Sequence, residues 1–311
     1  MEYGCNEYTY TLEKGWAKLP DGESLVDIVG LSIDEKDNVY AFGRSKKPLI
    51  VFDQNGNIVD SWGEGLFKRP HGSFMTHEGN IWLTDDASHA VFLFTRDGKL
   101  LKTLGKVGEK SDTGHRDGLD IFEKLSSIKR AGEPFNLPTG VAVASTGDIF
   151  VSDGYGNARV HRFSSDGELI LSWGSPGAAR GEFRLPHNIW IDKMDRIWIP
   201  DRENHRVQIF DVEGNFIDEW IDLWRPTHVY MDKEETVYIS ELSRRVSIYT
   251  IDGELLSRWG NEDHSLEDPL FVGPHVLCVD SRGDLYVGEV AQTFGKVDRG
   301  ARTLQKFKRK R

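Results

Sequence analysis

The chain has 311 residues, of which 50 are acidic and 39 are Lys or Arg, so its formal net charge is −11 at pH 7. This balance argues against a nucleic-acid partner, because phosphate binding requires a basic surface. We interpret the basic residues at 306–311 as a solvated tail or strand edge. The sequence has no run of about eighteen apolar residues, so we expect no membrane partner and, by default, a cytoplasmic location.

Residues 8–19 (YTYTLEKGWAKL) have strand character, and six copies of one unit follow them. Each copy contains short apolar segments rich in β-branched and aromatic residues, separated by turns with Asp, Asn or Gly. A period near forty residues with four strands per unit is typical of a β-propeller. We therefore predict an all-β, six-bladed β-propeller that forms one domain over residues 1–311. The copies span residues 26–63, 69–105, 137–174, 185–221, 225–260 and 272–311.

The fourth copy shows the unit most clearly, with strands expected at 188–192, 196–200, 206–210 and 216–220. The sixth copy supplies only three strands. We predict that the N-terminal strand at 8–19 completes this last blade, which would close the ring and hide strand edges that an open sheet exposes.

Three connections between copies are longer than the others. They span residues 106–136, 175–184 and 261–271, and the first contains a short predicted helix at 120–129. All three join the last strand of one copy to the first strand of the next, so we expect them to crowd one face of the molecule. Long loops in compact domains often carry function, so the site is expected on that face.

One column of the repeats indicates a metal site. After the proline that opens a copy, or its equivalent, histidine occupies alternate copies. Blades of a six-bladed ring are related by rotations of about sixty degrees, so three such imidazoles would converge on the axis. Three imidazoles with an open fourth position are typical of a catalytic zinc site, whereas a single rim histidine would need no metal. The column reads Val29, His71, Thr139, His187, Thr227 and His275.

A second column holds acids, and the residues after it vary. We interpret the acids as structural, because an Arg or Asn follows several of them and would form a hydrogen-bonded turn. Arg44 and Arg202 share the next position and could hold a carboxylate. Tyr155 could act as a base beside a divalent cation, although each of these three could also be structural. The acid column reads Gly43, Asp85, Asp153, Asp201, Glu241 and Glu289.

The other histidines and the two cysteines carry no chemistry in this interpretation. His228 falls one place after the ligand column and should point elsewhere, and His115 and His205 are expected at the surface. Cys278 lies in an apolar strand and should be buried, while Cys5 lies near the N-terminus; the sequence does not place them within bonding distance.

Two segments carry a family resemblance. PTGVAVASTGDIFVSDGYGNARVHRFSSDGELILSWG and GEFRLPHNIWIDKMDRIWIPDRENHRVQIFD resemble the NHL-repeat propeller of the peptidyl-α-hydroxyglycine α-amidating lyases, most specifically at VSDGY, PDREN and the three Pro-His pairs. The resemblance extends over all six copies. It implies a carbon–nitrogen lyase that converts an α-hydroxyglycine-type substrate into an amide and glyoxylate.

The resemblance also implies roles for individual residues. It implies zinc, or another divalent metal, bound by His71, His187 and His275. It implies that Tyr155 takes the proton of the substrate hydroxyl, and that the two arginines named above, Arg44 and Arg202, bind the carboxylate and the reacting centre.

Two positions depart from the family pattern. Val276 stands where the family has an Asp that contributes to a structural calcium site, which argues against such a site here. Gly273 replaces the family's Met.

Two other functions compete with the lyase, namely a propeller hydrolase or lactonase and a non-catalytic NHL-repeat binding module. A propeller hydrolase or lactonase usually has Asp, Glu and Asn on the axis, and His and Thr at these positions disfavour it. The acidic net charge and the histidine column disfavour the binding module. We expect a monomer that acts on a small-molecule or peptide-terminal substrate whose identity the sequence leaves open.

Overall fold

The structure, a computed structural model, describes residues 1–118, 120–260 and 269–311. They form two compact units. The terminal unit contains Met1–Leu66 and Thr227–Arg311, and the central unit contains Phe67–Pro226. Each unit has three antiparallel sheets of the blade type, and the fold class is the predicted all-β, six-bladed β-propeller. The expectation of one domain over residues 1–311 stays a prediction.

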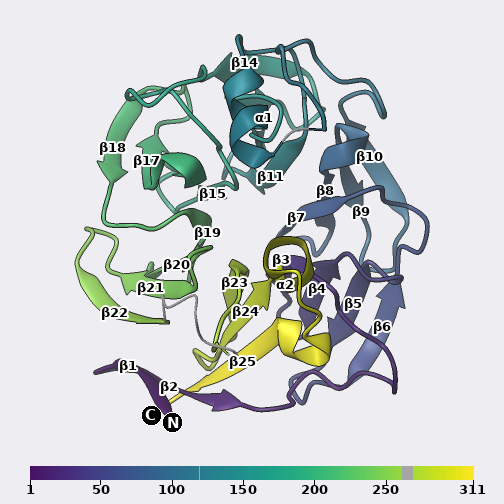
Figure 1. Cartoon of the computed structure of the whole chain (residues 1–311), viewed down its shortest axis with the longest axis vertical. Coiled ribbons are helices and arrows are strands. Elements are labelled where there is room, and N and C mark those ends of the chain that lie inside the picture. Colours follow the sequence, from purple (N-terminus) through teal and green to yellow (C-terminus); the bar gives the residue numbers. More distant parts are fainter. Residues whose placement is uncertain (119, 261–268) are drawn as a thin grey trace. The chain divides into compact units, whose positions relative to one another are not determined.

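The central unit consists of three four-stranded sheets, each formed by strands in chain order (Figure 1). The second copy forms β7 (Pro70–Met75), β8 (Ile81–Asp85), β9 (Ala90–Phe94) and β10 (Leu100–Leu104). The third copy forms β11 (Pro138–Val143), β12 (Ile149–Asp153), β13 (Arg159–Phe163) and β14 (Leu169–Trp173). The fourth copy forms β15 (Trp190–Ile191), β16 (Ile197–Asp201), β17 (Arg206–Phe210) and β18 (Phe216–Trp220).

The terminal unit has two four-stranded sheets and one five-stranded sheet. The first copy forms β3 (Ile28–Ile33), β4 (Val39–Gly43), β5 (Leu49–Phe52) and β6 (Ile58–Trp62). The fifth copy forms β19 (Pro226–Met231), β20 (Val237–Glu241), β21 (Arg245–Tyr249) and β22 (Leu255–Gly260). The five-stranded sheet combines β1 (Glu2–Cys5) and β2 (Tyr8–Glu13) with β23 (Pro274–Val279), β24 (Leu285–Glu289) and β25 (Leu304–Arg309).

The N-terminal strand completes the last blade, as predicted. β2 pairs antiparallel with β25, from Tyr10 opposite Arg309 to Glu13 opposite Lys306. The strand ends at Glu13 rather than residue 19, and β1 pairs with it as an additional fifth strand. The sequence prediction lacked β1, which follows from a tight hairpin whose Asn6 adopts φ 50°, a left-handed conformation that Asn tolerates.

The burial of the strands follows their position within a blade. In the fourth copy, every residue of β16 and β17 is buried, whereas β18 exposes Ile217 and Asp218. The inner strands are therefore packed on both faces, whereas the outer strand is partly open to solvent. β15 covers only two residues, shorter than the predicted strand at 188–192, and an isolated bridge from Pro186 to Asp201 precedes it.

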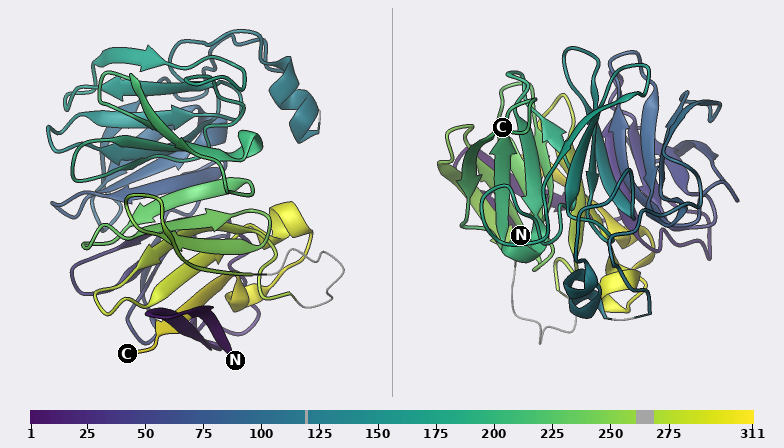
Figure 2. Two further views of the ribbon diagram at one scale, coloured as in Figure 1. Left: turned by 90° about the vertical axis from the view of Figure 1, so that its left-hand side faces the viewer. Right: turned by 90° about the horizontal axis from the view of Figure 1, so that it is seen from above.

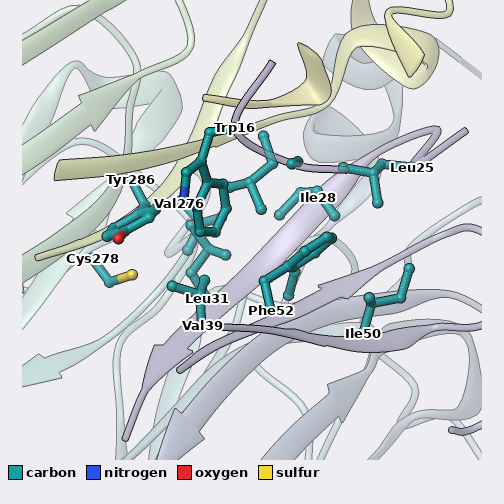
Figure 3. Close-up of a cluster of buried hydrophobic side chains, with 13 residues drawn as sticks. Trp16, Leu25, Ile28, Leu31, Val39, Ile50, Phe52, Val276, Cys278 and Tyr286 are labelled. Atoms are coloured by element: carbon teal, nitrogen blue, oxygen red, sulfur yellow. The ribbon is translucent and has the colours of Figure 1, made fainter. Parts of the chain in front are cut away.

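The chain segment after the closing strand seals the core of the terminal unit (Figure 3). The Trp16 ring lies 5.5 Å from that of Phe52 in the first blade and 4.9 Å from that of Tyr286 in the last blade. Its Nε1 donates a hydrogen bond to the carbonyl of Gln54 at 3.0 Å. Burying an aromatic ring of this size contributes several kcal/mol, so Trp16 ties the N-terminal segment to both sheets.

Short helices occupy some of the connections. The predicted helix at 120–129 is confirmed as α1 (Ile121–Ser127), which begins after Asp120, whose carboxylate accepts hydrogen bonds from the next turn. In the central unit α1 lies at one end of the strands (Figure 2, left). The described residues also form α2 (Ala291–Gly295) and the 3-10 turns η1 (Asp86–Ser88), η2 (Arg202–Asn204) and η3 (Gly300–Thr303).

The two long loops of the central unit meet, as expected. Leu125 and Ile128 from the first loop and Phe183 from the second line one pocket of about 440 Å³. Residues 261–268 of the third loop lie outside the described residues. Among the helices that are described, none is long and apolar enough to cross a membrane.

Candidate metal centre

Two of the predicted metal ligands lie side by side in the central unit. His71 is the second residue of β7, and His187 follows Pro186, with its backbone N–H donating to the carbonyl of Pro200 at 2.8 Å. Both side chains are fully buried, and their ring centroids are 4.8 Å apart. This is the convergence that the histidine column predicted for these two copies.

The orientation of His71 suits metal ligation. Its Nδ1 lies 2.6 Å from the carbonyl oxygen of Thr139, which can only accept a hydrogen bond. Nδ1 therefore carries the proton, and Nε2 keeps the lone pair that a metal would bind. Thr139 occupies the histidine column in the third copy, so that blade contributes an orienting carbonyl where its neighbours contribute imidazoles.

Tyr155 places a hydroxyl group at both imidazoles. Its oxygen lies 3.3 Å from Nε2 of His71 and 3.1 Å from Nε2 of His187. Its ring packs against Leu125 and Ile128 of the first long loop, so this loop supports the phenol from behind. Partly exposed and beside two nitrogens that can bind a metal, the Tyr155 hydroxyl can exchange a proton with a ligand at that position.

Arg202 is a buried cation that also contacts this hydroxyl. Its Nη1 donates to the Tyr155 oxygen at 3.2 Å, and its Nε donates to Glu203 at 2.8 Å. Burial alone would lower the pKa of Arg202, but attraction to Tyr155 and Glu203 outweighs burial and raises that pKa. Glu203 also pairs with Arg225 at 2.7 Å, so Arg202 is held in place and can stabilise negative charge that develops on the phenol oxygen.

A second guanidinium near Tyr155 was missed by the sequence prediction. The Cζ atom of Arg69 lies 5.5 Å from the Tyr155 ring centroid, the same distance as that of Arg202. The sequence does contain a signal for it, because Arg69 precedes a Pro-His pair at a position where the third and fourth copies have Leu137 and Leu185. The fifth copy also has an arginine at this position, Arg225, so the position alternates between apolar and charged residues and gives only a weak signal.

The remaining predicted site residues belong to the terminal unit. His275 is the second residue of β23 and its side chain is buried, like those of His71 and His187, and these three histidines are candidate metal ligands. Arg44 follows β4, and its Nη1 donates to Asp27 at 3.3 Å and to the hydroxyl of Thr293 at 2.9 Å. The structure therefore brings His71, His187, Tyr155 and Arg202 together in one unit.

The acid column is structural, as predicted. Asp85, Asp153, Asp201 and Glu289 accept hydrogen bonds from the backbone of the segment that enters their own blade, whereas Glu241 accepts from the side chains of Arg245 and Ser247. The Asp85 carboxylate accepts from the N–H groups of Lys68 and Arg69 at 2.7 and 2.8 Å, and Asp201 accepts from Arg184 and Leu185 at 3.0 and 3.1 Å. Glu289 repeats this with Val272 and Gly273 at 2.5 and 3.1 Å. These carboxylates tie the loops to the second strand of each blade, which satisfies backbone donors that would otherwise be buried without a partner.

Among the predictions for the other histidines, one is confirmed and one is wrong. His205 is exposed, as expected, and His228 is buried, which lowers its pKa to about 3. The prediction of a surface position for His115 is wrong, because only 1% of its side chain is exposed. The long loop folds back over it through the neighbouring Thr113, whose hydroxyl donates to the carbonyl of Gly156 at 2.5 Å.

The two cysteines and Val276 lie in the terminal unit and have structural rather than ligand-binding positions. Cys278 is buried and Cys5 exposed, and both are free thiols. Val276 packs in the apolar cluster around Leu31 and Tyr286, which is no environment for a calcium ligand. The absence of a structural calcium site itself stays a prediction.

Comparisons with known proteins support the repeat interpretation. A family model described as NHL repeat matches residues 135–163 and 183–210, in the third and fourth blades. Peptidyl-alpha-hydroxyglycine alpha-amidating lyase 1 from Drosophila melanogaster is 38% identical over 179 residues, which cover 54% of this chain and 30% of that protein. NHL repeat-containing protein 3 from Homo sapiens is 26% identical over 331 aligned residues, which cover 99% of this chain and 86% of that protein.

A solved structure supports the fold alone. Virginiamycin B lyase from Staphylococcus aureus superposes with a TM-score of 0.57 at 15% identity, covering 90% of this chain and 82% of that one.

Fold and comparisons together define the class: this chain is a six-bladed β-propeller whose third and fourth blades match the NHL-repeat model. The alignment with the fly peptidyl-α-hydroxyglycine α-amidating lyase covers about half of this chain, and the alignment with human NHL repeat-containing protein 3 covers nearly all of it. The alignment spans less than a third of the fly lyase's own length.

Proposed function

We propose that this protein is a zinc-dependent lyase that cleaves the C–N bond of an N-acylated α-hydroxyglycine, giving an amide and glyoxylate. The observation that carries the proposal is the position of the Tyr155 hydroxyl, 3.1 to 3.3 Å from Nε2 of His187, Nη1 of Arg202 and Nε2 of His71. Relatives named as α-amidating lyases share 30 to 38% identity with parts of this chain.

The donor set fits a zinc ion. His71 and His187 present buried imidazoles, and His71 is fixed in the tautomer that leaves Nε2 available. The repeat symmetry assigns the third imidazole to His275. Bound there, zinc would act as a Lewis acid toward the substrate hydroxyl.

In the proposed reaction, Tyr155 carries one proton from the substrate hydroxyl to the leaving amide. The Tyr155 oxygen, as phenolate, takes the proton of the substrate hydroxyl. The electrons of that O–H bond form the carbonyl of glyoxylate while the C–N bond breaks, and the amide nitrogen takes up the proton that Tyr155 accepted. Arg202 stabilises the negative charge on the phenol oxygen before the first transfer and after the second, and Arg44 stays assigned to the substrate carboxylate or the reacting centre.

Metal analysis tests the site. We expect near-stoichiometric zinc in the purified protein and its loss in His187→Ala. His205→Ala is the matched control, because His205 lies in the same blade but is exposed. Wild-type protein that binds no divalent metal, or a His187→Ala variant that keeps its zinc, would contradict the proposed ligand set.

Glyoxylate formation from α-hydroxyhippurate tests the reaction. A zinc-loaded protein that releases no glyoxylate would remove this lyase assignment.

One observation favours a second function. The relative that aligns with 99% of this chain is named only as an NHL repeat-containing protein. A non-catalytic binding protein would bind a carboxylate ligand without turnover, which the same glyoxylate assay separates from the lyase.

A further inference from the structure

Arg69 occupies the repeat position that holds Leu137 in the third blade and Leu185 in the fourth. In the second blade the N–H of Asp86 donates to the carbonyl of Arg69 at 3.2 Å, and in the fourth blade the N–H of Arg202 donates to that of Leu185 at 2.9 Å. The two positions are therefore equivalent. Leu185 is fully buried, whereas 41% of the Arg69 side chain is exposed. Where the fourth blade has a core leucine, the second blade thus has a cation that reaches solvent.

The guanidinium of Arg69 is fixed in place. Its Nε donates to the buried carboxylate of Asp86 at 2.5 Å, and its Cζ lies 5.5 Å from the Tyr155 ring centroid. Burial lowers the pKa of Arg69, but the charge of Asp86 more than offsets this effect, so the group stays a cation. Within the described part of the chain, no acceptor bonds its two Nη groups, which are the pair that grips a carboxylate in a bidentate manner.

Arg69 and Arg202 differ in what they can reach. The Arg202 side chain is only 6% exposed and is bonded to Glu203 and to the Tyr155 hydroxyl. Its charge is therefore committed to positioning the phenol. Arg69 stands beside the same phenol and its side chain is partly exposed, so a ligand that enters from solvent can bond to its Nη groups.

We propose that Arg69 binds the carboxylate of the substrate and thereby selects N-acylated α-hydroxy acids over the corresponding amides or esters. The inference rests on the proposed function, because it places a substrate beside Tyr155. It adds a specificity residue that neither the repeat columns nor the resemblance assigned.

Binding of a ligand that cannot react tests this role without relying on turnover. Hippurate has the N-acyl group and the carboxylate but no hydroxyl, and N-benzoylglycinamide lacks the charge as well. We expect Arg69→Met to weaken hippurate binding about tenfold or more in isothermal titration calorimetry, since a hydrogen bond to a charged group contributes at least this much. Binding of the amide should not change, and Arg69→Lys should retain part of the preference because it keeps a point charge.

Two further variants control for structure. Arg69→Met leaves Asp86 buried without its cation, so the double variant Arg69→Met/Asp86→Asn removes both charges and should show the same loss. Arg180→Met is the matched surface control, because the Arg180 side chain lies in the same unit and is 70% exposed. A merely structural role for Arg69 would weaken both ligands equally, and this outcome would overturn the inference.

The outcomes separate the inference from the proposed function. Wild-type protein that does not bind hippurate, or Arg69→Met protein that binds it as tightly as the wild type, contradicts the inference whether or not glyoxylate forms. Hippurate binding that depends on Arg69 in a zinc-loaded protein that forms no glyoxylate supports the carboxylate site and removes the lyase reaction.

Discussion

Removing one oxygen atom from Tyr155 should abolish most of the activity and leave the metal site intact. The Tyr155→Phe change deletes the contacts of 3.1 to 3.3 Å to His187, Arg202 and His71, but it keeps the ring that packs on the first long loop. A positioned general base contributes about 10²- to 10⁴-fold in rate, which corresponds to about 3 to 5 kcal/mol in the activation free energy. We therefore expect kcat to fall by at least about a hundredfold.

The same change should affect stability only modestly. Arg202 keeps its bond to Glu203, and Tyr155 is partly exposed, so we expect a loss of about 1 kcal/mol in the free energy of unfolding. Glyoxylate release, zinc content and urea denaturation measure the three quantities on one preparation. Tyr230→Phe is the matched control, because its hydroxyl donates a hydrogen bond to the carbonyl of Val279 at 3.2 Å and has no role in the proposed chemistry. A Tyr155→Phe variant with full kcat would refute the base role, and one that lost its zinc would show that the phenol is part of the metal site.

Three further predictions concern the fold and its ionisable groups. Tyr10→Ala should cost about 3 to 5 kcal/mol in urea denaturation, because this fully buried ring sits on the closing strand; an unchanged midpoint would mean that the strand does not hold the last blade. Burial lowers the pKa of His228 to about 3, so below pH 6.5 the unfolded chain binds a proton that the folded protein does not bind. The free energy of unfolding should therefore fall as the pH decreases, by about 2 kcal/mol at pH 5. His228→Gln should flatten this part of the stability profile, while the same change at exposed His205 should not; equal slopes would contradict the assignment. Iodoacetamide should modify Cys5 in the native protein and spare Cys278, whose thiol pKa is raised by burial, and mass spectrometry after proteolysis that found both labelled would contradict the buried position.

The repeat pattern was sufficient to predict the blades, because each blade is a local unit. Strand, turn and strand follow one another within about forty residues, and the alternation of apolar side chains records which face of a strand is buried. The acid column could be interpreted as structural for the same reason, because its hydrogen bonds are also local. Asp85 accepts from backbone N–H groups only 16 and 17 residues earlier in the chain. The fifth strand β1 and the burial of His115 were not predicted, because each depends on a turn or a loop path that has no periodic signal.

The sequence by itself therefore determined the class of fold, the closing role of the N-terminal strand and the histidine column. Only the tertiary structure decided that the Tyr155 hydroxyl meets the two imidazoles, because it comes from a residue 84 positions after His71 and 32 before His187. Only the tertiary structure also showed that Arg69 stands beside that phenol. Repeat columns align positions that are equivalent in each blade, whereas the chemistry arises where non-equivalent positions of neighbouring blades meet, and this depends on side-chain directions that no repeat period encodes.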